Sequence, residues 1–64
     1  MNDQPVFLFH PGQRVRVVAH GLNYEGVIEF CKWRRGDNLY CVEFAYDGKI
    51  DSREFFEEQL ESAE

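Results

Sequence analysis

The chain has 64 residues and a formal charge of −5; 44% of its residues are hydrophobic, 16% are aromatic and 30% are charged. A chain of this length folds as a single domain, residues 1–64, and leaves no room for a separate catalytic domain. Its apolar and aromatic content is too high for a disordered acidic segment. No apolar run approaches the ~20 residues of a membrane-spanning helix, and the N-terminus lacks the features of a signal peptide. We therefore expect a cytoplasmic protein with no membrane partner.

The negative charge is concentrated near the C-terminus. Residues 1–46 carry equal numbers of basic and acidic side chains, whereas residues 47–64 hold two basic residues against seven acidic ones. Binding to nucleic acid draws on a net positive charge or on a large basic face. The composition therefore disfavours a general affinity for nucleic acid.

The N-terminal third contains an arm, a turn and a first strand. Residues 1–4 are expected to be a loose end, whereas the apolar run 6–9 is expected to lie against the body of the fold. The segment His10-Pro11-Gly12 has the composition of a turn. In residues 13–19, Val15 and Val17 alternate with basic side chains, which predicts a strand with one face toward the core.

Residues 26–44 have the pattern of a β-hairpin. Two runs rich in β-branched and aromatic residues, 26–33 and 39–44, flank the polar turn 34–38. The following Asp47-Gly48 pair suits a type I′ turn, because both residues tolerate positive φ. A third strand is therefore expected to pair back onto residues 39–44.

The third strand is predicted over residues 49–54, followed by one helical or 3₁₀ turn over residues 55–60. A competing interpretation starts a helix at Asp51 or Ser52, with Asp51 as N-cap and Glu54 at the third helical position. The strand is favoured because a strongly indicated hairpin needs a partner strand. Together these elements predict an all-β fold, a small five-stranded SH3-like barrel with a short 3₁₀ or helical turn near the C-terminus.

The order of motifs resembles the small SH3-like barrels of the Tudor and KOW kind. The motifs are HPGQRVRV, YEGVIEF, LYCVEFAYDG and a closing FEEQLE, and the resemblance covers residues 9–61, with flexible termini outside. It implies a barrel and no particular activity.

The layout is also similar to that of the plasmid-borne type II dihydrofolate reductases, which are SH3-like barrels that become enzymes by tetramerising around a central pore. That family carries a Val-Gln-Ile-Tyr motif after the third-strand turn. Here Ile50 can stand for Val, but Asp51, Ser52 and Arg53 replace the residues that carry the activity. An oligomeric pore enzyme is therefore the least favoured of three functions considered from the sequence, and a test of cofactor binding would distinguish it from the others.

The register of the hairpin predicts an apolar patch on its outer face. If Ile28, Phe30, Val42 and Phe44 point inward, pairing centred on Gly36 places Cys31 opposite Cys41 and Trp33 opposite Leu39. An apolar patch of this kind is unusual on a small monomer. The alternative is a bulge near Gly26 or Lys32, which would turn Trp33 into the core and separate Glu29 from Glu43. Free thiols are expected in a cytoplasmic protein.

The favoured function is a non-catalytic protein-interaction module that self-associates or binds a protein partner through this hairpin face. Its expected binding residues are Cys31, Trp33, Arg34, Arg35, Leu39 and Cys41. The alternative is a nucleic-acid-binding module. In that case the tip Lys32-Trp33-Arg34-Arg35 stacks on bases and neutralises phosphates, with Arg14 and Arg16 as further contacts.

Other candidate chemistry is weaker. His10 and His20 lie in separate turns without a Cys, His or carboxylate at metal-ligand spacing, so no metal, cofactor or catalytic residue is predicted. Four aromatic residues could line a cage for methylated Lys or Arg, as in Tudor domains: Tyr24, Tyr40, Phe44 and Tyr46. Core packing is the favoured role, because Tyr40 and Phe44 share the parity of Val42.

Overall fold

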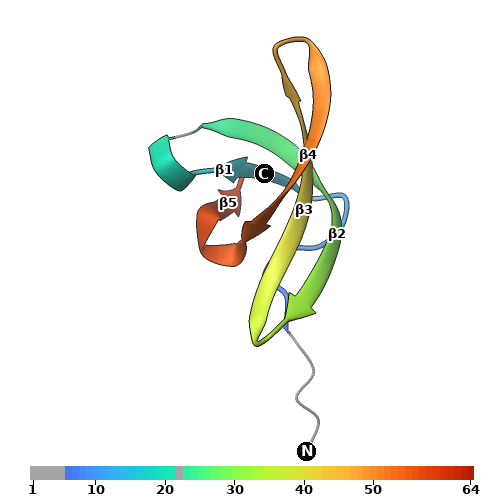
Figure 1. The fold of residues 1–64 in the computed structure, drawn as a ribbon, viewed down its shortest axis with the longest axis vertical. Helices are drawn as coiled ribbons and strands as arrows, with labels where there is room; N and C mark the ends of the chain where they lie inside the picture. Colours follow the sequence, from blue (N-terminus) through green and yellow to red (C-terminus); the bar gives the residue numbers. More distant parts are fainter. Residues whose placement is uncertain (1–5, 22) are drawn as a thin grey trace, which may run out of the picture.

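The computed structural model describes residues 6–21 and 23–64, apart from the side chain of His20. Within these residues one antiparallel sheet has the strand order β4-β3-β2-β1-β5 and does not close (Figure 1). The elements are β1 (Arg14–Val17), η1 (Ala19–Gly21), β2 (Tyr24–Arg34), β3 (Asp37–Tyr46), β4 (Lys49–Phe56), η2 (Glu57–Gln59) and β5 (Leu60–Ser62). Residues 1–4, expected to be loose, and Leu22 lie outside the described residues.

The predicted all-β fold is confirmed, with five strands and a 3₁₀ turn near the C-terminus. The competing helix from Asp51 or Ser52 is wrong, because β4 continues to Phe56 and pairs with β3 along its whole length. The N-terminal arm and η2 cover the core-facing side of the sheet.

Both hairpins turn through two residues with positive φ. Asp47 and Gly48 have φ of 53° and 75°, which confirms the turn predicted there, and Arg35 and Gly36 have φ of 53° and 84°. These angles suit type I′ turns, whose twist matches that of the flanking strands. The β2–β3 turn is therefore shorter than the five residues expected from the sequence.

The predicted register of the β2–β3 hairpin is wrong. Cys31 pairs with Tyr40 instead of Cys41, and Trp33 pairs with Asn38 instead of Leu39. The two-residue turn shifts the pairing by one position, and a bulge at Glu29 shifts it by one more, so that Ile28 pairs with Val42 and still faces the core. The bulge lies near neither of the two positions considered from the sequence, but it does keep Glu29 from directly facing Glu43.

The core is built from alternate residues of four strands together with the arm. Val15, Val17, Ile28, Tyr40 and Val42 are almost completely buried, and Phe9, Phe44 and Leu60 complete the cluster. The prediction that Phe30 belongs to the core is wrong. Beyond the bulge Phe30 pairs with Cys41 on the outer face, and it is about half exposed.

The arm is fastened to one end of the core through Tyr40. The Phe7 and Phe9 rings meet the Tyr40 ring edge-on, with centroid distances of 5.9 and 5.4 Å. The Tyr40 hydroxyl donates to the Glu57 carboxylate and accepts from the Leu8 amide at 3.0 Å. This confirms that the arm lies against the body of the fold through Phe7 and Phe9, whereas Val6 and Leu8 are exposed.

No helix in the described part of the chain is long and apolar enough to cross a membrane.

Candidate binding site

An aromatic pocket opens on the core-facing side of the sheet, toward the Asp47-Gly48 turn. Its volume is about 230 Å³, and three strands line it through Tyr24, Phe44, Tyr46, Asp51, Arg53 and Phe55. Side chains two positions apart on a strand share a face, so Phe44 and Tyr46 on β3 lie on the same side. The register Phe44–Asp51 brings the odd-numbered residues of β4 to that side as well. Strand alternation and the short β3–β4 turn therefore assemble the pocket.

Three rings form a corner at the back of the pocket. Tyr24 stacks on Phe44 with ring centroids 5.6 Å apart and an interplanar angle of 8°. Tyr46 meets Tyr24 nearly at right angles, at 81° and 5.4 Å. Phe44 is buried and anchors the group in the core, whereas Tyr46 is 55% exposed. The corner therefore presents aromatic surface from two directions to solvent.

Gly26 allows β2 to cross close to β3 beside this corner. A Cβ atom at Gly26 would lie 2.5 Å from the Glu43 carbonyl oxygen and 2.7 Å from Val42 Cγ1. Such contacts are too short, so only glycine fits without a shift of the backbone. The bulge role expected from the sequence is thus replaced by close strand packing, which also sets the position of Tyr24.

The rim of the pocket carries one acidic and one basic group from β4. The Asp51 carboxylate accepts from Arg53 Nε at 3.3 Å and from the backbone amide of Ser52 at 2.9 Å. Both side chains are exposed, so this ion pair is weak and easily exchanged for another cation. Asp51 can therefore receive a cationic group from a ligand.

The two cysteines of the predicted patch lie on opposite faces of the sheet. Cys31 faces the core side and donates to the Phe9 carbonyl oxygen at 3.6 Å, and burial raises its pKa. Cys41 lies on the outer face close to the Lys32–Glu54 ion pair, and burial together with the Glu29 carboxylate raises its pKa to about 11. Both are free thiols, as predicted.

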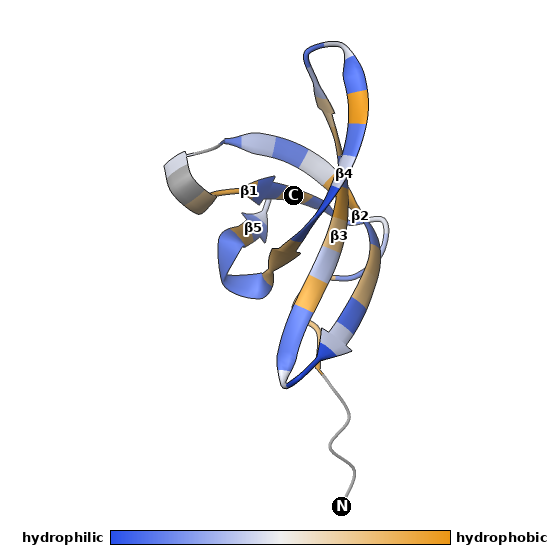
Figure 2. Ribbon diagram, in the orientation of Figure 1, coloured by the Kyte–Doolittle hydropathy of each residue, from blue (hydrophilic) through white to orange (hydrophobic). Residues whose placement is uncertain are grey.

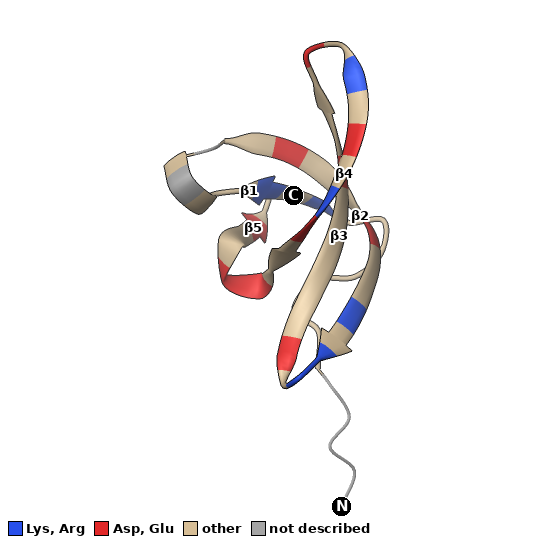
Figure 3. Ribbon diagram, in the orientation of Figure 1, with Lys and Arg blue, Asp and Glu red and all other residues tan. Residues whose placement is uncertain are grey.

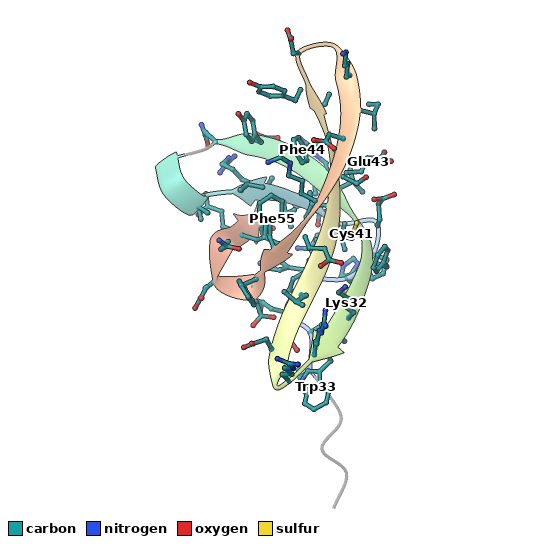
Figure 4. The ribbon with its side chains drawn as sticks, in the orientation of Figure 1. Lys32, Trp33, Cys41, Glu43, Phe44 and Phe55 are labelled. Atoms are coloured by element: carbon teal, nitrogen blue, oxygen red, sulfur yellow. The ribbon has the colours of Figure 1, made fainter. Side chains whose placement is uncertain are left out.

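The two other apolar residues of the predicted patch, Leu39 and Trp33, also lie on opposite faces of the sheet. Leu39 is half-buried on the outer face, whereas Trp33 is 50% exposed on the core-facing side, beyond the core itself. Figure 4 shows Trp33 at the free end of the β2–β3 hairpin, far from Phe44 and Phe55. The single patch is wrong because the true register separates its members. Binding through Trp33, Arg34 or Arg35 at the tip stays a prediction.

The cations expected to bind nucleic acid do not form one free basic face. Arg16 bonds to Glu61 at 2.9 Å and to Glu25 at 3.3 Å, and these carboxylates raise its pKa. Arg14 also pairs with Glu25, whose pKa the two arginines lower. Figure 3 shows the basic β1 beside the acidic C-terminal segment. Of the described salt bridges, none includes Arg34 or Arg35.

A second, larger hollow of about 470 Å³ lies at the other end, beside the tip of the β2–β3 hairpin. It is lined by Leu8, Gly36, Asp37, Asn38, Phe56, Glu57, Glu58 and Leu60. Its central carboxylate, Glu57, already accepts from Tyr40, Asn38 and the Leu8 amide, and Tyr40 and Asn38 lower its pKa. The aromatic pocket is the better candidate, because its rings and rim groups remain accessible.

The sequence groups three of the pocket rings, Tyr24, Phe44 and Tyr46, with Tyr40, and it favours the core for Phe44 and Tyr40. Both are indeed buried, but Phe44 also backs the pocket. Asp51, Arg53 and Phe55 were not predicted as lining residues. For Asp51 and Arg53 the signal was available, because the predicted Asp47-Gly48 turn places them opposite Phe44 and Val42, whereas Phe55 lies beyond the predicted strand.

Within the part of the chain that the structure describes, no three His, Cys, Asp or Glu side chains are grouped so as to hold a metal ion. Comparisons with protein-family models, with curated proteins and with solved structures found no match.

Proposed function

We propose that this protein is a non-catalytic protein-interaction module, akin to the SH3-like barrels of the Tudor kind, that binds a cationic side chain of a protein partner in the aromatic pocket. The resemblance to these barrels is supported by the order of the elements, which includes two tight hairpins and a 3₁₀ turn before the last strand. The proposal keeps the protein-binding role expected from the sequence and moves it from the outer face of the β2–β3 hairpin to the pocket.

The observation that carries the proposal is the corner of rings with a carboxylate on its rim. A cation over an aromatic face gains ~0.5–1 kcal/mol when exposed and ~2 kcal/mol or more when desolvated. Tyr24 and Tyr46 offer ring faces or edges in two directions, and Asp51 supplies the opposite charge. Methylated Lys or Arg fits best, because its methyl groups contact the rings and weaken its hydration.

Two further features favour a cationic ligand. The net charge of −5 attracts positively charged segments, and the excess lies in the C-terminal third that contains β4. Arg53 already pairs with Asp51 and competes for it. The competition is selective, because a ligand must offer contacts with the rings as well as a charge.

The test is a calorimetric titration with a peptide that carries trimethyllysine, with the unmodified and norleucine peptides as controls. Tyr46→Ala should weaken binding at least about fivefold, which corresponds to ~1 kcal/mol of lost cation–π energy. Tyr46→Phe keeps the ring and should bind like wild type, and so should Trp33→Ala at the far tip. Equal affinity of the norleucine and trimethyllysine peptides would contradict the proposal.

Nucleic-acid binding at the β2–β3 tip is the second candidate. The observation in its favour is that Trp33 is half exposed beside Arg34 and Arg35. A stacked aromatic side chain contributes ~1–3 kcal/mol per base. Salt-dependent binding of a short single strand that is lost in Trp33→Ala, with no binding of the cationic peptide, would replace the first proposal by this one.

A further inference from the structure

The β4 strand forms one edge of the sheet, because β3 is its only neighbour among the strands that the structure describes. In a two-residue hairpin the residues that flank the turn, here Tyr46 and Lys49, form a hydrogen-bonded pair. The alternate residues Ile50, Ser52 and Glu54 therefore direct their backbone N–H and C=O groups away from β3. The Ser52 amide fits this pattern, since it donates to the Asp51 carboxylate. Such an edge is a template for another strand.

The β3–β4 hairpin also projects beyond the rest of the fold (Figure 1), and it exposes apolar side chains to solvent. Ile50 is 69% exposed and Tyr46 is 55% exposed. Figure 2 shows a hydrophobic position between polar ones along the projecting part of β4. A 64-residue chain has a small core, and association is one way in which such chains gain buried apolar surface.

The charges on β4 distinguish between the registers of an antiparallel pair of β4 strands. With Ser52 opposite Ser52, Asp51 of each copy faces Arg53 of the other. A shift by one position in each copy centres the pair on Asp51 or on Arg53 and brings like charges together. The Ser52-centred register is also compatible with the backbone, because Ile50, Ser52 and Glu54 are the residues whose hydrogen-bonding groups point outward.

We propose that the β4 edge pairs with β4 of a second copy about a two-fold axis at Ser52, so that one sheet runs through both subunits. The partner's Ser52 carbonyl then accepts from the Ser52 amide and replaces the Asp51 carboxylate. The released Asp51 pairs with the partner's Arg53. Residues directly opposite each other share a face, so the two aromatic pockets open on the same side of the joined sheet. The dimer shares Asp51 with the proposed ligand site, but the proposal does not rest on what the pockets bind.

The charge pattern gives a test that is specific for the register. Asp51→Arg places two arginines opposite each other, and Arg53→Asp places two carboxylates opposite each other, so each single variant should sediment as a monomer. The double variant Asp51→Arg/Arg53→Asp restores opposite charges and should sediment as a dimer. An equimolar mixture of the two single variants should form the heterodimer, because each then complements the other.

The backbone gives an independent test. Ser52→Pro removes the outward amide and leaves the hydrogen bonds to β3 in place, so it should weaken the dimer at least about tenfold. Ser52→Ala keeps the amide and should dimerise like wild type. Circular dichroism confirms that each variant is folded.

A wild type that sediments as a monomer up to about 1 mM overturns the proposal. A folded Ser52→Pro variant that still dimerises also overturns it. A double variant Asp51→Arg/Arg53→Asp that stays monomeric overturns it as well. The double exchange also changes the pocket rim, so a restored dimer with lost peptide binding separates this interface from the proposed ligand site.

Discussion

The two ends of the core-facing side of the sheet differ in what covers them. At the Tyr40 end, the rings of Phe7 and Phe9 pack on the sheet, and Glu57 collects hydrogen bonds from Tyr40, Asn38 and the arm. At the Tyr46 end, the rings pack on one another and line an open pocket. Aromatic residues of the same strand thus serve stability at one end and, on our proposal, recognition at the other.

The largest expected effect is at the covered end. Phe9 is buried against Tyr40, so Phe9→Ala should lower the free energy of unfolding by about 3–5 kcal/mol. Tyr46→Ala, at the open end, should cost less than about 1 kcal/mol because Tyr46 is largely exposed. Urea denaturation of both variants measures the difference. Similar losses of unfolding free energy in the two variants would mean that aromatic side chains at the two ends contribute equally to stability.

The hydroxyl groups of the two tyrosines give a finer comparison. Tyr40→Phe removes the donor to Glu57 and the acceptor of the Leu8 amide, and it should cost about 1.5–3 kcal/mol. Tyr46→Phe is the matched control and should be close to neutral. If thermal unfolding shows no difference between these two variants, the hydrogen bonds of the arm do not contribute measurably to stability.

The same contacts predict how stability depends on pH. Burial and the Glu57 carboxylate raise the pKa of Tyr40 from 10.0 to about 12. The contribution of the neutral Tyr40 hydroxyl to stability is therefore complete below pH 10 and is lost as the pH rises toward 12. Hydrogen bonds from Tyr40 and Asn38 lower the pKa of Glu57 from 4.5, so its stabilisation is present above that value and is lost as the pH falls through the lowered pKa. In unfolding measured from pH 3 to 12, the alkaline loss of stability should be smaller in Tyr40→Phe and the acidic loss smaller in Glu57→Gln than in wild type. The remainder comes from groups such as Cys41, with a raised pKa, and Glu25, with a lowered one. Unaltered profiles in both variants would contradict this assignment.

The smallest effects are expected at the two turns, which have the same geometry at opposite ends. Gly48→Val and Gly36→Val should each cost about 1 kcal/mol or more, because valine does not tolerate positive φ. No atom lies within 4 Å of a Cβ added at either glycine, so the expected cause is backbone strain. Chemical denaturation should give similar losses for the two variants, and an unchanged midpoint in Gly48→Val would exclude the tight turn.

The two hairpins also show which parts of the fold the sequence predicts. The register of β3 with β4 follows directly from Asp47-Gly48, because the pair is a strong two-residue turn signal. The polar run 34–38 hides the equally short turn at Arg35-Gly36, since Arg35 is an unusual residue at positive φ. The like charges of Glu29 and Glu43 indicate a bulge but do not locate it at Glu29, so the favoured register assigns Phe30, Cys31 and Trp33 to the wrong faces.

The candidate site was predictable only in part. Tyr24, Phe44 and Tyr46 could be grouped by type, but their assignment to core or pocket depends on where the arm ends and how β2 crosses β3 at Gly26. Both depend on packing between residues far apart in the sequence, which the local sequence pattern does not predict. The ion pairs of Arg14 and Arg16 with Glu25 and Glu61 likewise depend on the neighbouring strands β2 and β5.

The most direct test of recognition at the open end is to map amide chemical shifts of the wild-type protein during titration with the trimethyllysine peptide. The account predicts saturable shifts at Tyr24, Tyr46 and Asp51, and none at Tyr40, Asn38 and Glu57. Shifts confined to the covered end or to the β2–β3 tip, or no saturable shifts at all, would contradict it.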